Sequence, residues 1–165
     1  MDREVVEQKL ESLRRCLKRI ETKCPPDPET LAADFDLQDI VSLNLSRAVQ
    51  LCVDIGAHLI SNLEVAPPDT MGQTFDLLTQ AGLLEPALGL SLKKAVGFRN
   101  IAVHNYDAIN WHIVHSLVKN HLSDFSDFAK CVSKKLGPTA TPLPLLRRCG
   151  VSESARSRTQ TMTWA

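Results

Sequence analysis

Apolar residues recur every three or four positions along most of this 165-residue chain, which is the period of an amphipathic α-helix. The pattern is clearest over residues 3–23, where the apolar stripe consists of Val6, Leu10, Leu13, Leu17, Ile20 and Cys24. The same period predicts further helices at 28–35, 38–62, 71–81, after Pro86, and at 108–136. No segment alternates as a strand does. Because short loops join these helices, we predict an all-α antiparallel bundle of four to five main helices.

Capping and turn residues mark where several of these helices begin and end. After the first helix, Asp27 fits an N-cap and Pro28 fits the first helical position. Thr70 and Gln73 have the spacing of a capping box before the 71–81 helix, and Gly82 fits its C-terminal end. These local signals agree with the hydrophobic period and support the same set of helices.

The periodicity ends at Gly137, and Pro, Ser, Thr and Arg dominate the sequence that follows. We therefore predict one helical domain over 1–137 and a disordered tail over 138–165. No run approaches the roughly 18 uncharged apolar residues of a membrane span. The N-terminus is charged from its second residue and has no apolar stretch of a secretory signal. These features predict a cytoplasmic protein with no membrane partner.

The five cysteines contain no Cys-x-x-Cys pair; they are Cys16, Cys24, Cys52, Cys131 and Cys149. In a cytoplasmic protein this spacing is typical of reduced, mostly packed thiols rather than of a disulfide framework or a zinc site.

The formal net charge of zero hides an uneven distribution of charge along the chain. Residues 25–92 have a balance of −9 and a single basic residue, Arg47, whereas residues 93–137 have a balance of +4. A locally basic segment permits an anionic substrate, but a dedicated nucleic-acid binder usually has a stronger basic excess. Charge alone therefore does not identify RNA as the ligand.

The segment GFRNIAVHNY, at 97–106, brings Arg99, His104 and Tyr106 within eight residues, and Tyr106 is the single tyrosine of the chain. At about 100° per residue, Arg99 and His104 lie roughly 140° apart around a helix, so they do not share one narrow stripe. We therefore expect one of two arrangements. Either the helix ends within the segment and His104 and Tyr106 turn back, or a second molecule completes the site.

These three residue types suit phosphodiester chemistry. The guanidinium of Arg99 can hold a phosphate and stabilise its developing charge, and the imidazole of His104 can accept or donate a proton. The phenol of Tyr106 can donate a hydrogen bond to the phosphate or orient the histidine. The alternative is that Arg99 and Tyr106 are surface residues and that His104 caps the helix C-terminus. Residue types alone favour this alternative, because such triplets often arise by chance.

Two other pairs of polar residues are weaker candidates for a functional site. Asp54 and His58 share a helix face, but the Glu-x-x-His pair of di-iron bundles is absent, so we predict no metal site and no cofactor. Arg47 and Asp54 are seven residues apart on one helix, and we interpret them first as a structural salt bridge and second as support for an active site.

The string Arg99-x-x-x-x-His104-x-Tyr106 resembles the signature of the HepT-like toxins of the HEPN superfamily. SRAVQLCVDIGAHLI (46–60) is similar to the long second helix of the family, and FDLLTQAGLL (75–84) to the helix and turn before the motif helix. VGFRNIAVHNY (96–106) is similar to the usual GFRN-x-x-VH-x-Y. The resemblance extends over about residues 3–136 and implies a HEPN-type bundle.

The resemblance implies a metal-independent endoribonuclease toxin of a type VII toxin–antitoxin system, which leaves a 2′,3′-cyclic phosphate and a 5′-hydroxyl. Arg99 matches the phosphate-binding arginine and His104 the acid–base histidine, with Asn100 and Asp54 as supporting residues. Two protomers of a homodimer would bring their motifs together across a cleft that binds RNA, either mRNA or tRNA. Tyr106 matches the tyrosine that an MntA-like nucleotidyltransferase antitoxin converts to O-AMP-tyrosine. A bulky anion at that position is expected to block the entry of RNA.

The chain has no nucleotidyltransferase pattern of its own, so an antitoxin of this kind would be a separate polypeptide. Two further hypotheses remain at the level of sequence. The first is a non-catalytic HEPN-like module that binds nucleotides or a protein partner in the same groove. The second is a structural or assembly bundle in which the motif only ends a helix.

Overall fold

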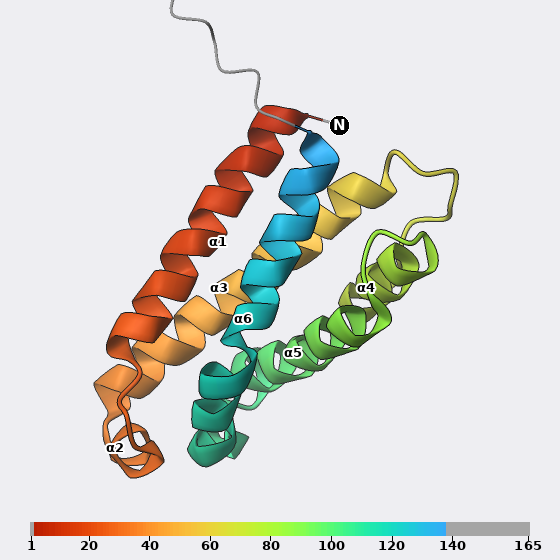
Figure 1. The fold of residues 1–165 in the computed structure, drawn as a ribbon. Helices are drawn as coiled ribbons and strands as arrows, with labels where there is room; N and C mark the ends of the chain where they lie inside the picture. Colours follow the sequence, from red (N-terminus) through yellow and green to blue (C-terminus); the bar gives the residue numbers. More distant parts are fainter. Residues whose placement is uncertain (1, 138–165) are drawn as a thin grey trace, which may run out of the picture.

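Every regular element in the computed structural model is helical. The structure describes residues 2–137, in which the elements are α1 (Arg3–Lys23), α2 (Pro28–Ala33), α3 (Phe35–Ile60), α4 (Met71–Gln80), α5 (Pro86–His104), the 3₁₀ turn η1 (Tyr106–Ala108) and α6 (Trp111–Leu136). Helices α1, α3 and α6 pack along one another, α4 and α5 pack together against α3, and α2 closes one end (Figure 1). No strand occurs in this range. The predicted all-α antiparallel bundle is confirmed.

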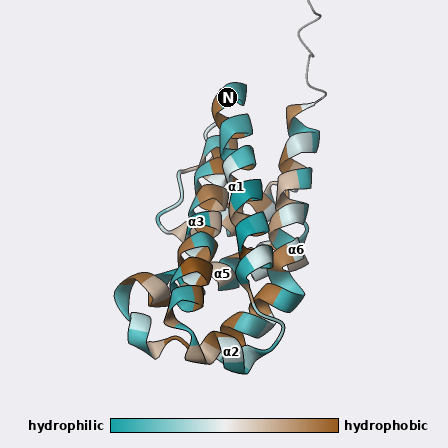
Figure 2. Ribbon diagram, turned by 90° about the vertical axis from the view of Figure 1, so that its left-hand side faces the viewer, coloured by the Kyte–Doolittle hydropathy of each residue, from teal (hydrophilic) through white to brown (hydrophobic). Residues whose placement is uncertain are grey.

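The core is built from the apolar stripes that the sequence predicts. Helix α1 buries one face, which consists of Val6, Leu10, Leu13, Cys16, Leu17 and Ile20. Phe75 of α4 and Phe128 of α6 meet edge to face at the centre, with ring centroids 6.2 Å apart and an interplanar angle of 83°. In Figure 2 the visible face of α1 is mostly hydrophilic, whereas α3 beside it is hydrophobic over much of its length. Burial of these stripes holds the helices together.

Helix α3 is the central helix of the bundle. By length and composition alone it is apolar enough to cross a membrane, with a hydropathy of 1.2 over its most apolar stretch. More than half of that stretch, 56%, is buried against the rest of the protein, and α3 contacts α1, α4, α5 and α6. Its hydropathy is therefore that of a core helix covered on most sides.

The capping residues act where the sequence predicts. The Asp27 carboxylate accepts from the Thr30 amide at 2.8 Å, and Pro28 begins α2. Thr70 Oγ1 accepts from the Gln73 amide at 3.2 Å, which forms one half of the predicted capping box. The other half is shifted, because Gln73 Oε1 accepts from the amide of Asp69 at 2.6 Å rather than from that of Thr70.

Two predicted helix starts are wrong by three residues, and the predicted helix ends at 35 and 62 lie two residues too far along the chain. Helix α3 begins at Phe35 rather than at 38, because the Asp34 carboxylate accepts from the Leu37 amide at 3.0 Å and acts as the N-cap. Helix α6 begins at Trp111 rather than at 108, because Asn110 Oδ1 caps it and the preceding residues form the η1 turn. Both caps lie in polar segments where the hydrophobic period carries little information.

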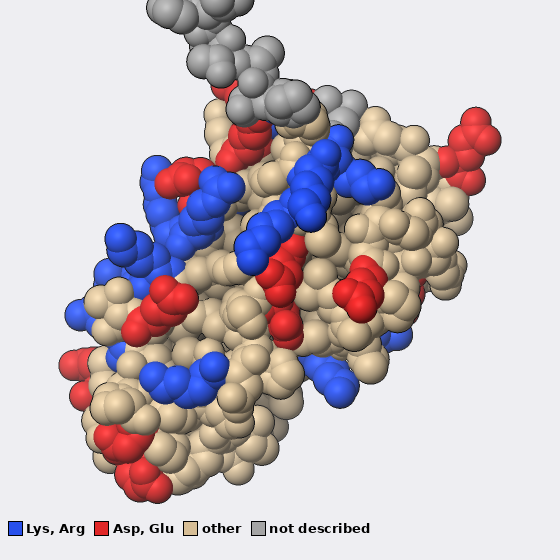
Figure 3. All heavy atoms as spheres, viewed as in Figure 1, with Lys and Arg blue, Asp and Glu red and all other residues tan. Residues whose placement is uncertain are grey.

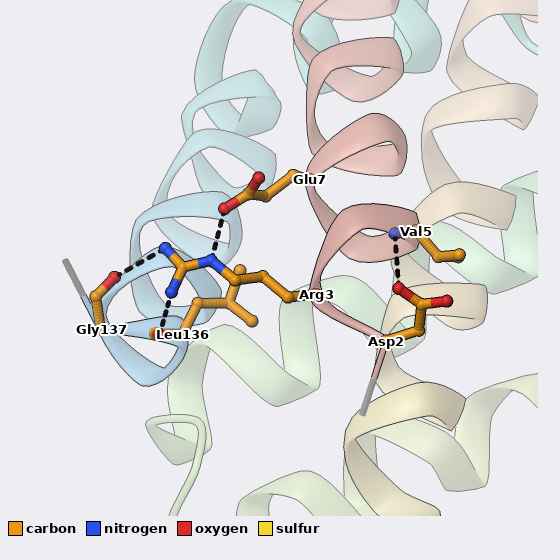
Figure 4. A network of polar contacts seen from close by, with 6 residues as sticks. All are labelled: Asp2, Arg3, Val5, Glu7, Leu136 and Gly137. Carbon is orange, nitrogen blue, oxygen red and sulfur yellow. Dashed lines mark hydrogen bonds and ion pairs between the residues drawn. The ribbon is translucent and has the colours of Figure 1, made fainter. Parts of the chain in front are cut away.

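The N- and C-terminal ends of the described chain are joined by Arg3 (Figure 4). Its guanidinium donates to the Leu136 carbonyl at 3.1 Å and to the Gly137 carbonyl at 3.3 Å. Its Nε atom donates to Glu7 at 2.7 Å, one turn further along α1. A cation at the C-terminal end of α6 satisfies carbonyl groups that the helix itself leaves without partners.

The cysteines of the described region carry free thiols, as predicted. Cys16, Cys24 and Cys52 are buried, and Cys131 is partly exposed. Burial raises the pKa of the Cys52 thiol well above its usual range, so it stays protonated. Cys149 and the predicted tail at 138–165 lie outside the described residues.

Candidate functional site

Helix α5 ends inside the motif. His104 is its last residue, and Asn105 leaves the helical conformation with φ −149° and ψ 62°. The Asn105 amide still donates to the Ile101 carbonyl at 2.8 Å, which closes the last turn. The chain then enters the η1 turn with Tyr106 as its first residue. The first of the two expected arrangements is therefore met in part: the helix stops and Tyr106 turns back, whereas His104 still belongs to the last turn of α5.

Tyr106 is held against α3. Its hydroxyl donates to Asp39 Oδ1 at 2.7 Å, across 67 positions of sequence. Its ring meets that of Trp111 edge on, with centroids 5.7 Å apart and an interplanar angle of 61°. Partial burial raises the pKa of the phenol, and the hydrogen bond to the Asp39 carboxylate raises it further, whereas a hydrogen bond with Ser42 lowers it to a smaller extent. Tyr106 is thus a protonated donor with a fixed ring, although 36% of the residue is exposed.

The other motif side chains make no polar contact with the rest of the described chain. Within residues 2–137 no hydrogen bond or ion pair engages the side chain of Arg99, Asn100 or His104. Arg99 is partly buried, whereas Asn100 and His104 are exposed. Their donors therefore face solvent and are available to an anionic ligand.

The structure does not bring Asp54 to the motif. Asp54 accepts from Lys9 Nζ at 3.0 Å and from Gln50 Nε2 at 2.8 Å, so its carboxylate joins α3 to α1. It lies 15 residues beyond Asp39 on the same helix, which corresponds to about 22 Å along the axis. Asp54 makes no contact with the motif in this protomer, and its supporting role stays a prediction. The predicted Arg47–Asp54 salt bridge is wrong, because Asp54 pairs with Lys9 instead.

Three residues of the site are absent from the sequence prediction. Asp39, Ser42 and Trp111 contact Tyr106, but they come from α3 and α6, and no local pattern connects them with 97–106. Only the packing of three helices at one end of the bundle brings them together. Within residues 2–137, no group of three or more His, Cys, Asp or Glu side chains is placed to hold a metal ion.

Comparison with known proteins relates the chain to ribonucleases. The sequence profile of ribonuclease HepT-like proteins matches residues 13–132. The mRNA nuclease HepT of Shewanella oneidensis is 39% identical over 125 residues, which are 76% of this chain and 93% of the relative. The tRNA nuclease HepT of Aphanizomenon flos-aquae is 24% identical over 132 residues, which are 80% of this chain and 90% of the relative.

A solved structure of a tri-AMPylated Shewanella oneidensis HEPN toxin in complex with an MNT antitoxin has a TM-score of 0.75 and 37% sequence identity. The match covers 81% of this chain and 99% of that one. The predicted HEPN-type fold is thereby confirmed, as is the predicted enzyme class, a ribonuclease. The chain belongs to the ribonuclease HepT-like family.

Proposed function

We propose that this protein is a cytoplasmic, metal-independent endoribonuclease and the toxin of a type VII toxin–antitoxin system. The observation that carries the proposal is the end of α5, where Arg99 and His104 present unpaired side chains beside a tyrosine fixed by Asp39. The 39% identity to an mRNA nuclease HepT supports an RNA substrate, either mRNA or tRNA.

The chemistry follows from the residue types. The imidazole of His104 takes the proton of a ribose 2′-hydroxyl, and the 2′-oxygen attacks the adjacent phosphorus. The bond from phosphorus to the 5′-oxygen breaks, and that oxygen leaves with a proton from an acid. Arg99 binds the phosphate and stabilises the charge that develops on it. The products are a 2′,3′-cyclic phosphate and a 5′-hydroxyl.

This reaction needs a base and an acid, and one protomer offers one motif histidine. A homodimer supplies the second, because two motifs facing each other across a cleft contribute two imidazoles and two guanidinium groups. Large exposed apolar side chains near the end of α5 support a second copy at this surface: Ile101 and Val103 are 45% and 55% exposed. Burial of such side chains favours association.

The cleavage test compares wild type with Arg99→Ala and His104→Ala on tRNA and mRNA, with chelator present. We expect cleavage by wild type only, with products that carry a 5′-hydroxyl and a 2′,3′-cyclic phosphate. His112→Ala is the matched control, because His112 is also exposed but lies in the first turn of α6. Wild-type cleavage by a folded His104→Ala protein would overturn the catalytic role. Loss of all activity on chelation would overturn metal independence.

The same cleavage assay tests the homodimer. If two protomers form the site, activity per protomer falls on dilution, in parallel with the dimer fraction measured by sedimentation. Activity per protomer that stays constant while the protein sediments as a monomer would contradict a composite site.

We further propose that a separate MntA-like nucleotidyltransferase adenylylates Tyr106. In this reaction the phenol oxygen attacks the α-phosphorus of ATP and pyrophosphate leaves. The raised pKa of Tyr106 makes its phenol a weak nucleophile, so a base must accept its proton. Once modified, Tyr106 has no hydroxyl hydrogen to give Asp39, and a phosphate would lie beside that carboxylate. The repulsion would displace the ring and its AMP into the space in front of the motif.

Intact mass after co-expression with an adjacent nucleotidyltransferase gene tests this step. We expect increments of one or more AMP units, and none in Tyr106→Phe, which lacks the single tyrosine of the chain. Increments that persist in Tyr106→Phe would place the modification elsewhere. An unmodified protein that binds nucleotides or the partner without cleaving RNA would favour the non-catalytic module.

A further inference from the structure

A basic hollow lies between α1 and α3, away from the motif. It has a volume of about 480 Å³, and no Asp or Glu lines it. Its polar lining consists of three arginines and three hydroxyl or amide side chains, namely Arg15, Arg19, Arg47, Ser12, Asn44 and Gln50. A hollow lined by guanidinium groups and neutral polar groups is suited to an anion.

Helical periodicity builds this hollow from two adjacent stripes. Arg15 and Arg19 are one turn apart on α1, and Asn44 and Arg47 are one turn apart on α3. The two helices run antiparallel in a register that the Lys9–Asp54 ion pair fixes. That register places Arg19 opposite Asn44, and Arg15 beside Arg47, so the three arginines line one hollow.

Two of the three arginines of the hollow, Arg19 and Arg47, are not neutralised by the described chain. Within residues 2–137, the side chains of Arg19 and Arg47 make no hydrogen bond or ion pair. Arg15 has only a 3.5 Å contact with Glu11, and its side chain is 77% exposed. Residues 12–20 of α1 contain four basic residues and no acidic one. Basic side chains gather over α1 in the upper left part of the molecule in Figure 3.

The hollow and the motif are connected along α3. Asp39, Leu43 and Arg47 form one exposed stripe of this helix, at spacings of four residues. Asp39 holds Tyr106 at one end of the stripe, and Arg47 enters the hollow about 12 Å further along the axis. A strand of RNA bound at the motif can follow this stripe and place a backbone phosphate against the arginines.

We propose that the Arg15–Arg19–Arg47 hollow binds a backbone phosphate of an RNA strand a few nucleotides from the bond that is cut. The proposal rests on the proposed ribonuclease function and names where the substrate continues beyond the motif. Arginines that hold phosphates position a strand without reading its sequence. The hollow therefore contributes affinity, and its contribution weakens with salt.

The test measures binding of a fluorescent all-2′-O-methyl oligoribonucleotide, which keeps every phosphate and lacks the nucleophile needed for cleavage. Arg19→Gln/Arg47→Gln is compared with wild type and with Arg14→Gln/Lys18→Gln. The control pair also removes two positive charges, both from α1, but neither residue lines the hollow. We expect the first pair to lose roughly tenfold in affinity at about 0.1 M salt. We also expect the slope of log affinity against log salt to shrink by about 0.7, the contribution of one phosphate on a single strand that the protein no longer neutralises.

Cleavage of unmodified RNA by the same proteins separates this proposal from the function on which it rests. A raised KM with an unchanged kcat in Arg19→Gln/Arg47→Gln supports the phosphate site. Unchanged affinity and salt slope, in a wild type that cleaves RNA, would overturn the site and leave the ribonuclease intact. Loss of binding in the variant, when wild type binds but does not cleave, would support the site and count against the ribonuclease. If Arg19→Gln/Arg47→Gln keeps its RNA affinity but no longer binds the nucleotidyltransferase, the hollow is a binding site for that protein and our proposal is refuted.

Discussion

The contact between Tyr106 and Asp39 gives the sharpest test of the site as the structure shows it. The hydroxyl donates to Asp39 Oδ1 at 2.7 Å, and both partial burial and this carboxylate raise the pKa of the phenol. Asp39→Asn removes the negative charge and leaves the burial of the ring. We therefore expect the pKa of Tyr106 to fall in Asp39→Asn but to stay above the ordinary value of 10.0.

The energy of this contact is modest because water competes for it. A hydrogen bond to a charged group contributes about 1.5–3 kcal/mol when it is well buried. Tyr106 is 36% exposed and Asp39 is an exposed residue, so we expect about 1 kcal/mol, or roughly a fivefold change in the docked fraction of the ring. Tyr106→Phe should lower the free energy of unfolding by a similar amount at neutral pH.

The sign of the pH dependence follows from the raised pKa. A phenol whose pKa is higher in the folded state favours folding while it is protonated. The stabilisation by Tyr106 is thus fully present below its ordinary pKa of 10.0, and it is lost as the pH rises through the folded value. Wild type and Tyr106→Phe should therefore converge in stability at alkaline pH.

The assay is a spectrophotometric titration of the phenolate, with circular dichroism at each pH to confirm that the protein stays folded. Because the chain has one tyrosine, the signal reports Tyr106 alone. Asp36→Asn is the control, since it removes one charge from the first turn of α3 without touching Tyr106. An Asp39→Asn phenol that titrates as in wild type would refute the reasoning. An equal fall in Asp36→Asn would show that the effect is general and does not come from the hydrogen bond.

Three further predictions concern stability and are measured by denaturant unfolding. Gly56→Ala places a methyl group 2.6 Å from Thr74 Cγ2. The overpacking costs about 1–3 kcal/mol, which exceeds the gain of about 1 kcal/mol from the higher helix propensity of alanine, so the variant should be less stable than wild type. Gly97→Ala adds the same methyl group where nothing lies within 4 Å, so it should raise the free energy of unfolding by up to about 1 kcal/mol. Equal effects of alanine at Gly56 and Gly97 would contradict the packing argument. Arg3→Gln should lower the free energy of unfolding by about 1 kcal/mol and speed hydrogen exchange of the amides in the last turn of α6, because the Leu136 carbonyl loses its hydrogen-bond partner. Unchanged exchange would show that Arg3 does not stabilise the C-terminal end of α6.

The sequence by itself determined the helices and the identity of the catalytic candidates. The apolar stripe of 3–23 predicts α1 with both of its ends, because period and capping residues are local properties. Thr70 and Gly82 likewise mark α4, and Gly82 has the φ of 70° that ends a helix through a left-handed residue. Arg99, His104 and Tyr106 were found because they lie within eight residues of each other and in the order of a known family.

Only the tertiary structure decided which other side chains meet them. Asp39 is 67 residues from Tyr106, and Asp54, which the sequence offers as a supporting residue, faces α1 about four turns away. Both are aspartates on the same helix, so composition and spacing do not distinguish them. The choice is made by the register of α1 against α3 and by the point at which α5 ends, and both depend on contacts between residues far apart in the chain. The arginine hollow has the same origin, because Arg15 and Arg47 become neighbours only when two antiparallel helices pack.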